Sequence, residues 1–119
     1  MDLRVYKNKI RTEVVIPLKE YKKECGKDSG YNIFHILACK NILVKYIKRL
    51  NAIYHLSDAK ILNAVQEAVL SLNRLNEKTD YCLIETDARE SIWEIIQGGA
   101  KERGLKSDSE DVTEQWREW

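Results

Sequence analysis

The chain has 119 residues, of which 44% are hydrophobic and 33% are charged, and its net charge is +1. That length suits one domain with one core, and that balance excludes an intrinsically disordered protein. No apolar run approaches the roughly 20 residues that a membrane-spanning helix needs, and no secretory signal follows Met1. We therefore expect a single cytoplasmic, helical domain over residues 1–119.

The first 16 residues give a mixed signal. Apolar and polar residues alternate near the start, and a β-branched run ends at Ile16. Pro17 disfavours helical geometry at the residue before it, so a short extended segment is compatible with this part of the chain. Because proline is tolerated in a first helical turn, we expect a helix over 17–25, ended by Gly26.

Two long helices are expected over 31–55 and 59–75. The first half of 31–55 is apolar nearly all round, which is typical of a helix with no face towards water, and its second half turns one apolar side, ending at Tyr54, towards the core. Ser57 or Asp58 can cap the next helix. The expected core positions of that helix are Ile61, Val65, Ala68, Leu72 and Leu75, and the expected solvent positions are Asn63, Gln66, Glu67, Asn73 and Arg74.

A fourth helix is expected to end near Arg103, where Gly104 supplies a left-handed stop. Thr86 or Asp87 can serve as its N-cap, and Asp87 has capping-box spacing to Glu90. This helix carries its apolar residues on one face. They are Ala88, Ile92, Ile95 and Ile96.

Gly99 lies on the same face as those isoleucines, although glycine inside a helix costs about 1 kcal/mol relative to alanine. It indicates the close approach of another helix or of the tail. The tail, 105–119, ends in Trp116 and Trp119, and a disordered tail would gain little from two large aromatic side chains. We expect these tryptophans to anchor the tail to an all-α, four-helix-type bundle.

The residues capable of metal or nucleophilic chemistry are few. Cys25, Cys39 and Cys82 are odd in number and widely spaced, which argues against a disulfide framework and for a reducing compartment. His35 and Cys39 share a helical face, but two ligands do not make a zinc site, and their apolar neighbours favour a place in or near the core. We expect no metal and no cofactor.

Two charged clusters could have a function, but each is also explained by ordinary helix structure. Glu85, Asp87 and Glu90 could perform acid–base chemistry, but acidic residues at a helix start complement its dipole. A basic cluster is formed by Lys40, Lys45, Lys48 and Arg49. It lies opposite an apolar stripe, as a solvated helix face does, and it lacks the interleaved aromatic side chains of a nucleic-acid site.

The charge is unevenly distributed along the chain. Residues 1–60 carry +7, residues 61–84 carry −1, and residues 85–119 carry −5. Such polarity steers the encounter with a charged partner more than it shapes the fold, although a chance difference between solvated surfaces would give the same numbers. A basic partner is expected to meet the acidic end, and the proposed contact residues are Glu110, Asp111, Glu114 and Glu118.

The last third of the chain resembles a group of small, uncharacterised bacterial proteins that share an acidic Asp-(Ile/Val)-Thr-Glu-x-Trp-Arg-x-Trp end. The resemblance rests on Ile84, Glu85, Thr86, Ala88, Arg89, Glu90, Ala100, Gly104, Asp111, Val112, Thr113, Glu114, Trp116, Arg117, Glu118 and Trp119. Proteins of this style are frequently encoded beside polymorphic or contact-dependent inhibition toxins, and several are their immunity proteins. The resemblance implies a protein that binds and masks a toxin, without enzymatic activity of its own.

Two other functional hypotheses remain open at this point. A regulatory nucleic-acid-binding protein could use the basic first half, and retention on heparin or duplex DNA would favour it. A small enzyme could assemble a site from His35, Glu85 and other distant residues, and convergence of those side chains in an open pocket would support it.

The anchoring of the tail is directly testable. We expect Trp116→Ala to lower the melting temperature, because the substitution removes a large aromatic surface that holds the tail on the body. Thermal unfolding followed by circular dichroism measures this. An unchanged melting temperature would mean that Trp116 is exposed or free for a partner.

Overall fold

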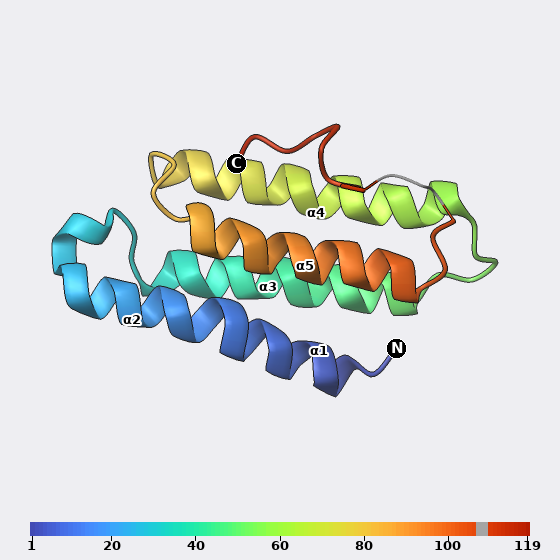
Figure 1. Ribbon diagram of the computed structural model, residues 1–119, viewed down its shortest axis with the longest axis horizontal. Helices are drawn as coiled ribbons and strands as arrows, with labels where there is room; N and C mark the ends of the chain where they lie inside the picture. Colours follow the sequence, from blue (N-terminus) through green and yellow to red (C-terminus); the bar gives the residue numbers. More distant parts are fainter. Residues whose placement is uncertain (107–109) are drawn as a thin grey trace.

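The computed structural model describes residues 1–106 and 110–119, and every regular element in them is helical. The predicted all-α bundle is confirmed. The elements are α1 (Leu3–Ile10), the π turn η1 (Arg11–Val15), α2 (Ile16–Cys25), the 3-10 turn η2 (Gly26–Ser29), α3 (Ile33–Asn51), α4 (Asp58–Lys78) and α5 (Thr86–Glu102). The first rod of the bundle runs without a break from α1 through the π turn into α2, and α3, α4 and α5 are the other rods (Figure 1). Within the described residues, no helix has the length and apolar character needed to cross a bilayer.

The extended segment that the sequence allowed before Pro17 is not formed, because the chain stays helical there. Ile16 has φ −62° and ψ −49°, and its N–H donates to the carbonyl of Arg11, five residues earlier. The wider π turn fits a proline, whose missing N–H would otherwise interrupt the regular ladder. Val14 and Val15 are both buried, so core packing offsets the local bias of the residue before proline.

α3 contacts each of the other three rods. It begins with a capping box, in which the Asn32 side chain accepts from the N–H groups of Phe34 and His35 while His35 Nδ1 accepts from the Asn32 N–H at 3.1 Å. Its core residues are Ile36, Cys39, Leu43, Tyr46, Ile47 and Leu50. Since the helix stops at Asn51, Tyr54 is 80% exposed, and its predicted place on the buried side is wrong.

α4 begins after Ser57, whose hydroxyl accepts from the Lys60 N–H at 3.2 Å, as predicted. All five predicted core positions of this helix are buried. The prediction fails at Asn73, which is only 7% exposed. Its amide is turned towards the C-terminal tail and not towards solvent.

The N-cap of α5 is Glu85, so the predicted cap at Thr86 or Asp87 is wrong. The backbone before it is fixed by buried polar side chains of α4's end. The Ile84 N–H donates to Asn76 Oδ1 at 2.9 Å, and the Leu83 N–H donates to Thr79 Oγ1 at 3.2 Å. These tertiary bonds start the helix one residue early, and the Glu85 side chain makes no capping bond.

The predicted close approach at Gly99 is confirmed, and α3 is the neighbour. A Cβ at Gly99 would lie 3.2 Å from Leu50 Cδ1 and 3.3 Å from Ile47 Cδ1. The helix ends as predicted before Gly104, which has φ +106°. Glycine is therefore required at one position for packing and favoured at the other by backbone geometry.

The tail docks on the body, as predicted. Trp116 and Trp119 are half-buried against the core, and Val112 is buried. Polar side chains of the helices also bind its backbone. Asn73 Nδ2 donates to the Trp116 carbonyl at 2.8 Å, and Gln97 Oε1 accepts from the Val112 N–H at 2.9 Å. The chain ends over α4 (Figure 1).

The two adjacent glycines of α5 form a matched pair for testing the helix contact. Gly99→Leu is expected to destabilise the protein by about 1–3 kcal/mol, because the new side chain must displace Leu50 and Ile47. Gly98→Ala is expected to stabilise it by about 0.5–1 kcal/mol, because a Cβ there meets nothing within 4 Å. Urea denaturation measures both. A Gly99→Leu variant as stable as Gly98→Ala would contradict the close contact.

Candidate recognition surfaces

The acidic tail contains one carboxylate with an internal structural role. Asp111 Oδ1 accepts from Trp93 Nε1 at 3.0 Å and from the Thr113 N–H at 2.9 Å, and Oδ2 lies 3.1 Å from Arg117 Nη1. The Arg117 guanidinium in turn lies over the Trp119 ring, 5.5 Å from its centroid. Asp111 therefore ties the tail to α5 and organises the turn that follows it.

Asp111 is held in its charged form. Burial alone would raise the pKa of this carboxyl, but the hydrogen bonds from Thr113, the positive charge of Arg117 and the hydrogen bond from Trp93 together keep the pKa below its ordinary value. The charge of Asp111 is thus largely satisfied within the chain.

The other three predicted contact residues lie at the surface. Glu110, Glu114 and Glu118 are exposed, and the tail backbone that carries them is fixed to the helices. The Glu118 N–H donates to Asn73 Oδ1 at 3.1 Å, while its side chain remains exposed. A tethered backbone presents these carboxylates in a set arrangement. The structure separates the four predicted residues into one structural and three surface positions.

The basic cluster of α3 is partly neutralised by α4. Lys45 Nζ lies 3.5 Å from Glu67 Oε1, and Arg49 also pairs with the Glu67 carboxylate. Lys40 and Lys48 are exposed. Two of the four basic side chains thus share one counter-charge, which weakens the positive field that a nucleic-acid site needs.

Of the two residues considered for a metal, His35 caps α3 and Cys39 is fully buried. Burial raises the pKa of the Cys39 thiol to about 12, so it stays protonated at neutral pH. Among the described residues, no three His, Cys, Asp or Glu side chains are grouped so that they could hold a metal ion. The three cysteines are all unbridged.

The expectation that the first half of α3 has no face towards water is wrong. Phe34 is 76% exposed, and Leu37, one turn later, is 38% exposed. α3 is covered by the other rods along its core side, and none of them covers this stripe. Such exposed apolar surface is typical of an interaction site.

Other exposed apolar side chains lie at the same end of the bundle. Tyr21, near the end of α2, is 44% exposed, and Tyr81, in the α4–α5 loop, is 53% exposed. The two loops at this end touch, since a Cβ at Gly30 would lie 2.7 Å from Cys82 Cβ and Sγ. We call Tyr21, Ile33, Phe34, Leu37 and Tyr81 the apolar end.

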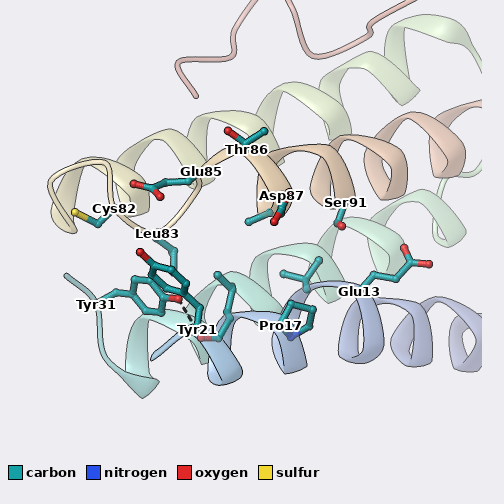
Figure 2. Close-up of a pocket in the computed structure, with 13 residues that line it drawn as sticks. Glu13, Pro17, Tyr21, Tyr31, Cys82, Leu83, Glu85, Thr86, Asp87 and Ser91 are labelled. Carbon is teal, nitrogen blue, oxygen red and sulfur yellow. Dashed lines mark hydrogen bonds between the residues drawn. The ribbon is translucent and has the colours of Figure 1, made fainter. Parts of the chain in front are cut away.

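A pocket of about 450 Å³ opens beside the apolar end, between α2, the π turn and the first turns of α5. Figure 2 shows Tyr21 and Tyr31 at one end of it, Glu85 and Asp87 on the α5 side, and Glu13 at the other end. The π turn positions Glu13, and the α4–α5 loop with the start of α5 forms the opposite wall. Its full lining is Glu13, Val14, Pro17, Leu18, Tyr21, Tyr31, Cys82, Leu83, Glu85, Thr86, Asp87, Ala88 and Ser91.

One wall of the pocket is rigid. The Tyr31 hydroxyl donates to the Leu18 carbonyl at 3.0 Å, and the Tyr31 ring stacks on Tyr21 with centroids 6.3 Å apart. Burial, and the negative charges that Tyr21, Cys25 and Glu85 would carry, raise the pKa of Tyr31 to about 12. The phenol is therefore neutral at physiological pH, and its ring is fixed in place.

Comparison of the chain with protein-family models, with curated proteins and with solved structures found no match.

Sequence reasoning missed the pocket and the apolar end. Glu13, Tyr21 and Glu85 are far apart in the sequence, and the packing of the π turn against α5 brings them to one cavity. The exposed stripe on α3 was missed because an apolar run predicts burial. The π turn beside the pocket was not predicted either, and such turns are frequent at functional sites.

The tail turn generates a stability prediction. Asp111→Asn is expected to destabilise the protein by about 1–2 kcal/mol, because it removes the charge that Arg117, Thr113 and Trp93 satisfy. Because folding lowers the pKa of Asp111, its contribution is complete above the ordinary carboxyl pKa of about 4 and is lost as the pH falls through the lower, folded pKa.

Chemical denaturation at neutral pH and at a series of acidic pH values measures both effects. Glu110→Gln is the matched control, because Glu110 is the exposed neighbour and its loss should change stability by less than about 0.5 kcal/mol. Equal stability of Asp111→Asn and Glu110→Gln at neutral pH would show that the Asp111 bonds contribute nothing.

Proposed function

We propose that this chain is a non-enzymatic binding protein of the immunity type, which neutralises a bacterial toxin by covering its active site or substrate groove. The observation that carries the proposal is the exposure of Phe34 and its neighbours on a helix whose other side forms the core. Burying a phenylalanine side chain contributes about 1.5–3 kcal/mol. In the free protein the apolar end is exposed to water, so this burial free energy becomes available only when a partner covers it.

The apolar end has the composition of an interface centre. Three of its five side chains are aromatic, and aromatic side chains carry much of the binding energy in protein interfaces. The acidic side chains Glu85 and Asp87 lie beside it at the start of α5. An apolar centre with an acidic edge favours a basic partner surface.

The acidic tail supplies a second, electrostatic contribution. Glu110, Glu114 and Glu118 are exposed, and hydrogen bonds with Asn73 hold the tail backbone at Trp116 and Glu118 on α4. Charges at the edge of an interface act chiefly on the association rate and on partner choice. In this proposal the apolar end anchors the complex, and the tail accelerates its formation.

Binding to a candidate toxin domain, encoded beside this chain, tests the proposal. We expect Phe34→Ala to weaken the complex about tenfold or more, because a central aromatic anchor is lost. Tyr54→Ala is the matched control, because Tyr54 is an equally exposed aromatic outside the apolar end, and it should leave affinity unchanged. Surface plasmon resonance gives the rates, and loss of inhibition gives the functional readout.

Charge reversal of Glu110, Glu114 and Glu118 to lysine should slow association at low salt and have little effect at high salt. Equal affinity of the Phe34→Ala and Tyr54→Ala variants would remove the apolar end from the interface. Failure to form any complex, together with clear retention on heparin, would favour the nucleic-acid alternative.

A further inference from the structure

The electrostatics of the pocket favour a cation. Its lining holds three carboxylates, Glu13, Glu85 and Asp87, and no Lys, Arg or His is among the described residues that line it. The start of α5 also lies here, and a helix N-terminus carries roughly half a positive charge. Three carboxylates outweigh that half charge, so the field inside the pocket is negative.

Glu13 gives a second, independent reason. Its Oε2 atom is buried and has no hydrogen-bond partner. A buried carboxylate oxygen without a donor costs free energy, and such atoms in native proteins call for an explanation. Because the Glu13 side chain lines the pocket, a positive charge inside the pocket would offset part of that cost electrostatically.

The remaining walls fit an apolar body behind the charge. Val14, Leu18, Leu83 and Ala88 supply aliphatic surface, and the Tyr21 and Tyr31 rings supply aromatic surface. Aromatic faces attract cations, and a planar guanidinium also stacks on them. A volume of about 450 Å³ accommodates a long side chain with part of its backbone. Carboxylates next to aromatic and aliphatic walls suit a ligand whose positive charge sits at the end of a flexible apolar stem.

We propose that this pocket binds an arginine side chain presented by the partner, with its guanidinium beside the Glu85 and Asp87 carboxylates at the start of α5 and its aliphatic stem against the apolar and aromatic walls. Arginine fits better than lysine because its five N–H donors can serve separate carboxylates at once, and because it is more weakly hydrated. That the arginine belongs to a toxin partner depends on the proposed function, whereas the preference of the pocket for an arginine side chain does not.

Titration with N-acetyl-arginine amide tests the pocket without any partner. We expect saturable chemical-shift changes in the 15N-labelled protein at the amides of Tyr21, Leu83 and Asp87. The neutral isostere N-acetyl-citrulline amide should bind several-fold more weakly. Equal binding of the two compounds, or the absence of saturable shifts at these amides, would overturn the proposal.

A double substitution with a matched control isolates the charge. Glu85→Gln with Asp87→Asn should weaken binding of the arginine amide by about three- to tenfold, since exposed charge pairs contribute modestly. Glu90→Gln with Glu94→Gln removes the same charge from exposed positions of α5 outside the pocket lining and should leave binding unchanged. Equal weakening in both pairs would mean that only the overall charge matters.

Alkylation of Cys82 gives a readout that needs no substitution of a carboxylate. Cys82 lines the pocket and is partly exposed, whereas Cys39 is buried. In a Cys25→Ser background, the arginine amide should slow iodoacetamide alkylation of Cys82 in a saturable manner, and citrulline amide should not. If the arginine amide binds but Phe34→Ala and Tyr54→Ala have the same toxin affinity, the pocket proposal is supported and the proposed function is contradicted. If the arginine amide does not bind but Phe34→Ala alone weakens toxin binding, the proposed function is supported and the pocket proposal is contradicted.

Discussion

The close contact between α3 and α5 at Gly99 is the constraint on which the rest of the structure depends. Without a side chain there, Ile47 and Leu50 of α3 pack directly against the α5 backbone, and the Tyr46 hydroxyl donates to the Ile96 carbonyl at 2.7 Å. At the far end, Arg103 donates to the carbonyls of Leu50, in the last turn of α3, and of Ile53, just beyond it. The position of α5 fixed in this way sets one wall of the pocket and the anchor points of the tail.

The tail motif that suggested a family is largely explained by folding. Asp111 binds Trp93, Thr113 and Arg117, and Arg117 lies over Trp119. Val112 and Thr113 are buried, so most residues of the motif belong to one structural turn. A pattern that folding alone accounts for says little about the identity of a partner. Side chains that folding leaves exposed are the better candidates for recognition.

The fold class, the three long helices after residue 30 and most core positions were predictable from the sequence, because a helix that buries one face repeats its apolar residues with the helical period. The wrong predictions share one cause, because in each case tertiary packing overrode the local preference of the residue. Asn73 is polar yet buried because it hydrogen-bonds the tail, and Phe34 is apolar yet exposed because no other helix covers it. Ile16 stays helical before Pro17 because a π turn and a packed core permit it. The pocket could not be predicted, because it forms only when the first rod packs against α5 through the π turn.

The α4–α5 loop, which carries Tyr81 of the apolar end, is held in one backbone conformation. Asp80 and Tyr81 adopt left-handed backbone angles, φ 55° and φ 63°, which cost of order 1–3 kcal/mol each in residues with a Cβ. The buried residues Asn76 and Thr79 hold them there, because the Asn76 carbonyl accepts from the Tyr81 N–H at 2.8 Å and the Thr79 carbonyl accepts from the Cys82 N–H at 3.1 Å. These hydrogen bonds fix the loop that carries both the Tyr81 ring and one wall of the pocket. In the proposed function, this order before binding lowers the entropy lost when the partner arrives.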